Sequence, residues 1–488
     1  SNLILKFLGD VAVNGHPELE GREHPKHFIT PILPKLPKDY KKSVKGSRER
    51  LIELGPKKFA EWMREEKEVL ITDTTMRDAH QSLFATRMRS HDLWEIAPYY
   101  EALMPELFSI ECWGGATFDV SMRFLNEDPW ERLTKLRQMI PGTLFQMLLR
   151  GVNGVGYTSY PDNVIQYFVK QAAEKGIDLF RVFDSLNIMD NMRVSIDSVL
   201  EANKLCEGTI CYTADIFDAA RPKYQLSYYV KLAKALEKAG AHIIGIKDMA
   251  GVCRPEAAKA LVTALKNETS LPIHFHTHDT SGISAATVLA AIEAGVDAVD
   301  TALDSLSGLT SQPPMGSIIH ALKGTERASK IDLGAMNQIS TYFEGVRSIY
   351  APFEATMRSG TSDVYNHEMP GGQYTNLREQ ARSMGLEPRW NEVSKAYAEV
   401  NKMFGDIVKV TPSSKVVGDM ALMMVTQDIT PKEVLDPARE IAFPQSVVGL
   451  LKGELGIPED GFPRDITEKV LKGEPQIQGR PGAHLAPV

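Results

Sequence analysis

One supersecondary unit repeats between about residues 69 and 308 of the chain: a short apolar run, then a longer stretch with helical periodicity. Helical stretches such as Asn163–Lys175, Tyr228–Ala239 and Pro255–Leu265 separate the runs, and several end at a glycine that can cap a helix. Eight strand–helix units in about 240 residues predict an α/β fold, a (β/α)8 TIM barrel. The eight apolar runs are Val69–Thr75, Leu107–Gly115, Thr143–Gly151, Ile177–Ser185, Thr209–Asp215, Ala241–Gly251, Pro272–Gly282 and Ala298–Gly308.

The alternative architecture is a doubly wound open sheet, but the first strand is not followed by the GxGxxG turn of that fold. The chain has 488 residues, which is long for a single core, so we expect smaller parts beside the barrel. We expect a connector at residues 1–65, the barrel at 66–334, and a mainly helical domain at 335–488 that completes the mouth of the active site. The connector includes an extended proline-rich stretch, Pro25–Pro37.

Composition excludes several classes of function. The net charge is −8 and the chain has no basic tract, which argues against nucleic acid as a partner. No apolar run approaches the roughly 20 residues that a membrane span needs, and no signal peptide is visible. The four cysteines show no CxxC spacing, which indicates a reducing compartment.

Polar residues follow the predicted strands where each strand stops being apolar. In barrels of this class, chemistry takes place at the carboxyl ends of the strands. Five of the eight predicted strands end in acidic, basic or imidazole groups, which predicts an active site on this face of the barrel. These groups are Asp78, Arg150, Asp184, Lys247 with Asp248, and His276 with His278.

His276 and His278 are two residues apart in a strand-like run, so both imidazoles share one face of the strand. Together with a carboxylate from the first strand they would form a site suited to Zn²⁺ or Mn²⁺. The alternative is a pair of hydrogen-bonded core histidines. We prefer that alternative for His274, which lies one step deeper on the same face.

Lys247 lies within the apolar run Ile243–Lys247, where an ammonium would be unfavourable if buried. One interpretation is an ion pair with Asp248 or Asp184. The other is a neutral amine that reacts with CO₂ to form a carbamate, whose oxygen binds a metal. The residues alone do not favour either interpretation.

The run Asp73–Leu83 (DTTMRDAHQSL) resembles the first barrel strand of the biotin-dependent carboxyltransferases. This group includes the pyruvate carboxylases, oxaloacetate decarboxylase and transcarboxylase, and is more distantly related to aldol-type lyases and synthases that act on acyl-CoA. The segment Lys6–His16 resembles the connector that leaves a biotin carboxylase half. Further stretches are similar to the pyruvate carboxylases in particular: Leu149–Tyr160, Ile246–Gly251, Tyr365–Leu377 and Val410–Asp419.

The resemblance implies a role for each matching residue. A divalent metal would be bound by Asp78, carbamylated Lys247, His276 and His278. The substrate-binding residues would be Arg77, Asp78, Ala79, His80, Gln81, Arg150 and Thr411. The catalytic residues would be Arg77, Asp119, Arg150, Tyr157 and Thr411. Biotin would be contacted by Tyr157, Ser414 and Lys415.

The reaction that the resemblance implies is carboxyl transfer from carboxybiotin to pyruvate, which gives oxaloacetate. Thr411 would carry the proton between pyruvate and biotin. From the residues alone Thr411 reads differently, because it precedes a proline and the helix-like stretch Lys415–Thr426. That position is typical of a residue just outside a helix N-cap.

The chain begins Ser1-Asn2 without a methionine and contains neither an Ala-Met-Lys-Met biotinylation motif nor an ATP-grasp half. We therefore expect a fragment that depends on separate biotin carboxylase and biotin carboxyl carrier domains. We expect it to form a homodimer, and the complete enzyme a tetramer, in the cytoplasm of a bacterium or in the mitochondrial matrix. The alternative functions are an oxaloacetate decarboxylase or transcarboxylase subunit, an acyl-CoA lyase or synthase, and a metal-binding scaffold without activity.

Overall fold

Eight parallel strands close into a barrel in the order β1 to β8 in the computed structural model of the chain. The structure describes residues 2–16, 30–36, 45–354 and 357–488, so Ser1 and parts of the predicted proline-rich linker lie outside the described residues. The predicted (β/α)8 barrel is confirmed. Its strands are β1 Leu70–Asp73, β2 Ser109–Gly114, β3 Leu144–Leu149, β4 Leu179–Val182, β5 Leu205–Cys211, β6 Ile243–Asp248, β7 Ile273–Thr277 and β8 Ala298–Thr301.

Seven of these strands lie within the predicted apolar runs, whereas β5 begins at Leu205, four residues before the predicted start at Thr209. Glu207 and Gly208 interrupt the apolar pattern there and hide the strand in the sequence. Glu207 is nevertheless buried, because its Oε1 lies 2.5 Å from Nε of Arg181 inside the barrel. A polar residue is tolerated in this position because its charge is paired.

Helices surround the barrel, and the predicted helical stretches correspond to α7, α9 and α10. Gly240 and Gly295 follow α9 and α11 with φ of 94° and 90°, a conformation that glycine adopts without strain. No described helix combines the length and apolar character needed to cross a membrane. The barrel helices are α3 His80–Phe84, α4 Ser90–Leu103, α5 Ala116–Val120, α6 Pro129–Met139, α7 Asp162–Lys175, α8 Met189–Glu201, α9 Leu226–Lys238, α10 Pro255–Glu268, α11 Ser284–Glu293, α12 Met315–Ala321 and α13 Leu333–Tyr350.

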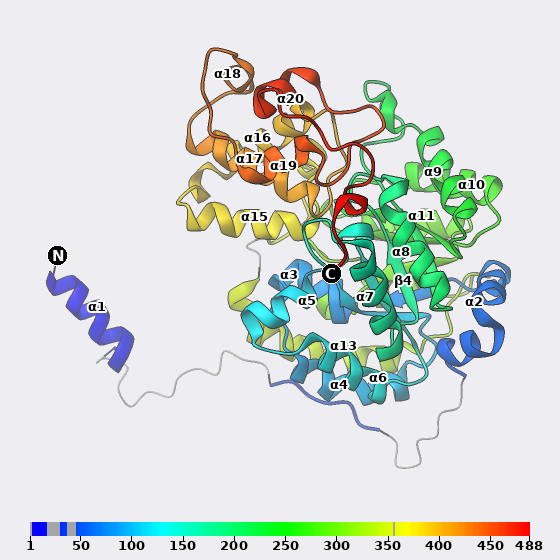
Figure 1. Cartoon of the computed structure of the whole chain (residues 1–488). Helices are drawn as coiled ribbons and strands as arrows, with labels where there is room; N and C mark the ends of the chain where they lie inside the picture. Colours follow the sequence, from blue (N-terminus) through cyan, green and yellow to red (C-terminus); the bar gives the residue numbers. More distant parts are fainter. Residues whose placement is uncertain (1, 17–29, 37–44, 355–356) are drawn as a thin grey trace.

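Helix α2 (Ser47–Glu65) closes the amino-terminal end of the barrel. Its buried residues Leu51, Phe59 and Met63 pack against the residues that begin the strands. The opposite end of the barrel, where the strands finish, is left for the site. Helix α1 (Asn2–Asn14) lies apart from the barrel (Figure 1).

The C-terminal helices gather on one side of the barrel (Figure 1), and their buried apolar residues form most of a second hydrophobic core. Helix α13 instead contributes its buried face to the barrel core. The division of the chain near residues 65 and 334 stays a prediction. The C-terminal helices are α14 Val364–His367, α15 Gly371–Ser383, α16 Trp390–Met403, α17 Ser413–Thr426, α18 Pro431–Leu435, α19 Gln445–Lys452 and α20 Arg464–Leu471.

Candidate active site

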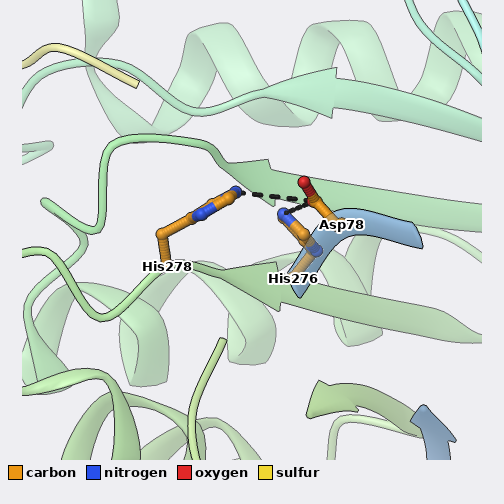
Figure 2. Close-up of side chains that lie close together, drawn as sticks. All are labelled: Asp78, His276 and His278. Carbon is orange, nitrogen blue, oxygen red and sulfur yellow. Dashed lines mark ion pairs between the residues drawn. The ribbon is translucent and has the colours of Figure 1, made fainter. Parts of the chain in front are cut away.

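Three side chains that can hold a metal ion meet at the carboxyl end of the barrel: Asp78, His276 and His278 (Figure 2). Their ligand atoms all lie within 4.8 Å of one another. Asp78 belongs to the π-helical turn η2 (Thr75–Ala79) that follows β1. His276 lies in β7 and His278 directly after it. The predicted convergence of a first-strand carboxylate with the histidine pair is therefore present in the structure.

Hydrogen bonds at Nδ1 aim both imidazole rings at Asp78. Oδ2 of Asp300, on β8, lies 2.6 Å from Nδ1 of His276, and the carbonyl oxygen of Thr310 lies 2.6 Å from Nδ1 of His278. Each Nδ1–H donates to its partner, and the two Nε2 atoms lie 3.4 and 3.6 Å from Oδ2 of Asp78. Burial lowers the pKa of both histidines, which keeps Nε2 unprotonated and able to bind a metal.

Oδ2 of Asp78 is a buried oxygen that accepts no hydrogen bond from the described residues. Burial by itself would raise the pKa of this carboxyl, but the nearby Arg77, His278 and Lys247 hold it well below its usual range. The group is therefore an ionised carboxylate with spare acceptor capacity that faces two imidazole nitrogens. This arrangement fits a divalent cation, and the oxygen and nitrogen donors suit Zn²⁺ or Mn²⁺.

Lys247, at the end of β6, stands beside the same three side chains. Its Nζ lies 3.9 Å from Oδ2 of Asp78 and 3.2 Å from Nε2 of His276. Burial lowers the pKa of Lys247, and Asp78 opposes that shift only in part. An amine whose neutral form is favoured can react with CO₂.

The ion pair between Lys247 and Asp248 or Asp184, left open by the sequence, is not what the structure contains. The Asp248 carboxylate accepts hydrogen bonds from the amides of the following loop and from the Thr277 hydroxyl. The Asp184 carboxylate likewise accepts from backbone amides of its own loop and from Asn191. Both carboxylates bond to the loops after their strands and form no ion pair with Lys247 among the described residues. Lys247 instead contacts the candidate metal ligands Asp78 and His276.

His274 lies one layer deeper, in a buried ionic network. Its Nδ1 lies 2.7 Å from Oε2 of Glu207, and its Nε2 lies 2.7 Å from Oδ1 of Asp300. Arg181 forms ion pairs with both carboxylates. Although burial favours the neutral ring, Glu207 and Asp300 raise the pKa of His274 to about 9. The interpretation of His274 as a hydrogen-bonded core residue is confirmed, and Asp300 connects it to His276.

A cavity of about 850 Å³ lies over the candidate metal ligands, between the barrel and the C-terminal helices. Its far wall is formed by α15, which contributes Gln373, Asn376 and Gln380. Both parts of the chain therefore build the site. The predicted site residues that line the cavity are Arg77, Asp78, Gln81, Asp119, Arg150, Tyr157, Lys247, His278, Thr411 and Lys415.

Arg150 supplies a buried positive charge to this cavity. Its Nη1 donates to the carbonyl oxygens of Val155 and Gly156 at 3.0 and 2.9 Å, and its guanidinium carbon lies 5.2 Å from the ring centroid of Tyr157. Its Nε is buried and has no hydrogen-bond partner among the described residues. Burial lowers the pKa of Arg150, but a guanidinium stays protonated in proteins. The side chain can therefore bind a small carboxylate.

Arg77 is held in place from two sides. Its Nη2 forms a buried ion pair with Glu111, and its Nη1 donates to Oε1 of Gln81 at 3.4 Å. Although burial opposes the charged form, Asp78 and Glu111 raise the pKa of Arg77. Asp119 forms an ion pair with its helix neighbour Arg123 at 3.0 Å.

The hydrogen-bonded network predicted for Arg77, Asp119 and Tyr157 is only partly present. The three residues line the same cavity. No direct hydrogen bond joins one to another within the described part of the chain.

Thr411 lines the cavity from the C-terminal side, two residues before α17. The predicted position just outside a helix N-cap is confirmed. The N-cap residue is Pro412, however, and no side chain provides a cap hydrogen bond to α17. The hydroxyl is therefore available to the cavity. Lys415, in the first turn of α17, also lines the cavity and forms an ion pair with Asp419 at 2.7 Å.

Four predicted site residues do not line the cavity, and one of them, His276, lies directly behind it among the candidate metal ligands. Ala79 belongs to the hydrophobic core of the barrel. Nε2 of His80 donates to the carbonyl oxygen of Met76 at 3.0 Å, and burial lowers the pKa of His80 to about 3. The hydroxyl of Ser414 is buried without a hydrogen-bond partner among the described residues. The side chains of Ala79, His80 and Ser414 are buried away from the cavity, and their binding roles stay predictions.

The sequence did not single out the residues that orient the site. Asp300 lies near the start of the predicted run Ala298–Gly308, and an acidic residue inside an apolar run was an available signal. Thr310 acts through its carbonyl oxygen, which no residue type reveals. The wall formed by α15 depends on how two parts of the chain meet, and such contacts leave no periodic pattern in the sequence.

Comparisons with known proteins agree with this architecture. Residues 364–488 match the family described as "Conserved carboxylase domain", and residues 165–342 match the family described as HMGL-like. The solved carboxyl transferase domain of Rhizobium etli pyruvate carboxylase is 62% identical, with a TM-score of 0.93 over 99% of this chain and 81% of that chain. The same domain solved with pyruvate and biocytin matches with the same identity, TM-score and coverage.

Fold, site and likeness together define a carboxyl transferase domain built on a (β/α)8 barrel. More particularly, the chain belongs to the family of pyruvate carboxylase carboxyl transferase domains. It is 53% identical to pyruvate carboxylase of Bacillus subtilis, covering 99% of this chain and 42% of the relative. It is 49% identical to the mitochondrial pyruvate carboxylase of Homo sapiens, covering 99% and 41%. The chain thus spans about two fifths of the length of these relatives.

Proposed function

We propose that the chain transfers a carboxyl group from carboxybiotin to pyruvate and so forms oxaloacetate. One observation carries the proposal: Arg150 and Thr411 line the same cavity as Asp78 and His278 of the candidate metal site. The solved relative that holds pyruvate and biocytin supports the choice of substrates.

Each side chain then has a distinct task. Arg150 binds the pyruvate carboxylate, and Gln81 lies beside it in the cavity. Thr411 accepts a methyl proton of pyruvate while its own proton passes to biotin, so its oxygen never carries a full charge. A divalent ion bound by Asp78, His276 and His278 would supply a Lewis acid that stabilises the negative charge developing on the substrate oxygen.

Lys247 would complete the metal site as a carbamate. Its neutral amine attacks CO₂, a C–N bond forms, one proton is released to solvent, and the new carboxylate provides an oxygen ligand. The buried amine has a pKa below its ordinary value because of desolvation, and it lies beside Asp78 and His276; both observations support this step. The metal is Zn²⁺ or Mn²⁺ in this proposal.

The partners follow from the same reaction. Biotin would arrive on a biotin carboxyl carrier domain after carboxylation by a biotin carboxylase domain. The larger size of the pyruvate carboxylase relatives supports such additional domains. Tyr157 and Lys415, on the cavity wall, would contact the biotin ring. A homodimer of this chain and a tetramer of the complete enzyme remain predictions, as does the bacterial cytoplasm or mitochondrial matrix as its location.

The test is an oxaloacetate decarboxylation assay with free biotin, combined with metal analysis of the same preparation. We expect turnover that requires both biotin and the bound metal, and that chelation followed by Zn²⁺ or Mn²⁺ restores. An acyl-CoA lyase would instead cleave a hydroxyacyl-CoA substrate without biotin. Turnover of oxaloacetate that is indifferent to biotin would contradict the proposal.

A further inference from the structure

The segment that carries Thr411 is connected to the barrel by a buried lysine two residues earlier. Lys409 is only 1% exposed. Its Nζ donates to Oε2 of Glu368 at 2.8 Å and lies 3.4 Å from the hydroxyl of Thr213. Thr213 follows β5. Its amide donates a hydrogen bond to the hydroxyl oxygen of Tyr229, and its carbonyl oxygen accepts one from the same hydroxyl. The ammonium group thus joins the C-terminal part of the chain to a loop at the barrel mouth.

Glu368 is shared between this lysine and an arginine of the barrel. Its carboxylate pairs with Arg221, in the loop between β5 and α9, as well as with Lys409. Nε and Nη2 of Arg221 also donate to the two carboxylate oxygens of Asp406, at 2.9 and 2.6 Å. Although burial opposes ionisation, Lys409 and Arg221 lower the pKa of Glu368 to about 2. Two cations and two anions therefore balance across the junction of the two parts.

A second anchor holds the other side of Thr411. The hydroxyl of Ser413 lies 3.1 Å from the carbonyl oxygen of Ser185, in the loop after β4. The same hydroxyl lies 2.8 Å from the carbonyl oxygens of Val408 and Val410. Thr411 is thus flanked, two residues away on each side, by contacts to the loops after β4 and β5. The candidate metal ligands Asp78, His276 and His278 lie at the same end of the barrel as these loops, so the contacts hold the Thr411 segment against the part of the barrel that carries the site.

We propose that Lys409 is a positioning residue, which with Glu368 holds the hydroxyl of Thr411 in register with the substrate in the barrel. This inference rests on the proposed function, because it assigns a purpose to the placement of Thr411. Lys409 itself does not line the cavity, and it acts through the backbone that leads to Thr411.

The geometry explains why a charged pair occupies this position. A buried ion pair adds little net stability compared with apolar packing of similar volume, but it accepts only a narrow range of arrangements. Proton transfer requires heavy atoms about 2.6–3.2 Å apart. A displacement of about 1 Å can slow such a step by about 100-fold. An apolar side chain could fill the space of Lys409 without fixing the segment that follows it.

The experiment compares wild type with Lys409→Met in biotin-dependent oxaloacetate decarboxylation, in H₂O and in D₂O. We expect kcat to fall by on the order of 10- to 100-fold. KM for oxaloacetate should stay nearly constant, because Arg150 and the metal ligands belong to the barrel. The solvent isotope effect on kcat should rise, since transfer of the exchangeable proton becomes slower. Metal content should be unchanged.

Two further variants make the comparison specific. Lys231→Met removes another lysine that pairs across the two parts, with Glu459 at 2.8 Å, but this pair is exposed and far from Thr411 in sequence. It should leave kcat and the isotope effect as in wild type. Glu368→Gln keeps Lys409 and removes only the buried negative charge. It should reproduce the effect of Lys409→Met. If Lys409→Met does not fold, Glu368→Gln alone tests the positioning role.

A loss of rate with an unchanged isotope effect, or a loss confined to KM, would overturn the positioning role in favour of a purely structural one. Wild-type activity in both Lys409→Met and Glu368→Gln would overturn it as well. Wild-type protein that shows no dependence on biotin would count against the proposed function itself, so the two failures are distinguishable.

Discussion

Oδ2 of Asp300, on β8, lies 2.6 Å from Nδ1 of His276, on the neighbouring strand β7. This contact fixes the ring so that Nε2 faces Asp78 and Lys247. The same carboxylate group also pairs with His274 and Arg181. Asp300 thereby connects the buried ionic network inside the barrel to the candidate metal ligand His276. Ligand orientation in this site depends on a residue that does not itself face the metal position.

Asp300→Asn is expected to weaken metal binding, because the amide cannot stabilise the ring orientation as the carboxylate does. Partners of this kind contribute about 10- to 100-fold in metal affinity. Competition with a chromophoric chelator measures the affinity directly. Glu293→Gln, which removes an exposed carboxylate from α11, serves as the control and should bind metal as wild type does. Equal affinity of the two variants would show that Asp300 does not orient the site.

Lys247→Ala is expected to lose both metal and turnover while the barrel stays folded. The hydrophobic core of the barrel and helix α2, which closes its amino-terminal end, do not include Lys247. The circular dichroism spectrum should therefore be close to that of wild type. Metal analysis after extensive dialysis measures occupancy, and Lys231→Ala is the matched surface control. A Lys247→Ala protein with full metal occupancy and turnover would exclude the carbamate ligand.

Arg150→Ala should raise KM for oxaloacetate and lower kcat, because the carboxylate loses its forked partner. Arg150→Lys restores a positive charge without the planar fork and should recover only part of the activity. Steady-state kinetics on both variants, at equal metal content, tests this order. If lysine restores full activity, a point charge is sufficient and the bidentate role is wrong.

The sequence predicted the barrel and the meeting of a histidine pair with a carboxylate from the first strand, because both depend on local patterns. Apolar runs of strand length mark the strands, and the spacing of His276 and His278 places both rings on one strand face. The start of β5 was missed because Glu207 looks like a loop residue until its partner Arg181 is known. Contacts that join distant segments, such as Asp300 with His276, arise only when the barrel closes.

Stability should depend on pH through His274. Its folded pKa of about 9 lies above the ordinary value of 6.5, so the protonated ring stabilises the folded state fully below pH 6.5. That contribution is lost as the pH rises through 9, and it amounts to on the order of 3 kcal/mol. Urea unfolding of wild type between pH 6.5 and 9.5 should show this loss, and His274→Gln should show a flatter profile. Parallel profiles would indicate that His274 is not protonated in the folded protein.

Thr411→Ala tests the residue for which sequence pattern and family resemblance gave different interpretations. The hydroxyl lines the cavity and does not cap α17, so its removal should leave stability and metal content close to wild type. Proton transfer by a positioned group contributes about 10²- to 10⁴-fold. Biotin-dependent turnover should therefore fall by at least about 100-fold, and Thr411→Ser, which keeps the hydroxyl, should retain part of the rate.

The structural alternative for Thr411 predicts the opposite pair of results. Loss of a helix cap would lower the free energy of unfolding by about 1 kcal/mol and leave turnover per folded molecule nearly intact. Measuring urea unfolding and turnover on the same Thr411→Ala preparation separates the two. An active but less stable variant would end the proton-transfer role, because a hydroxyl that carries the proton cannot be removed without slowing the reaction.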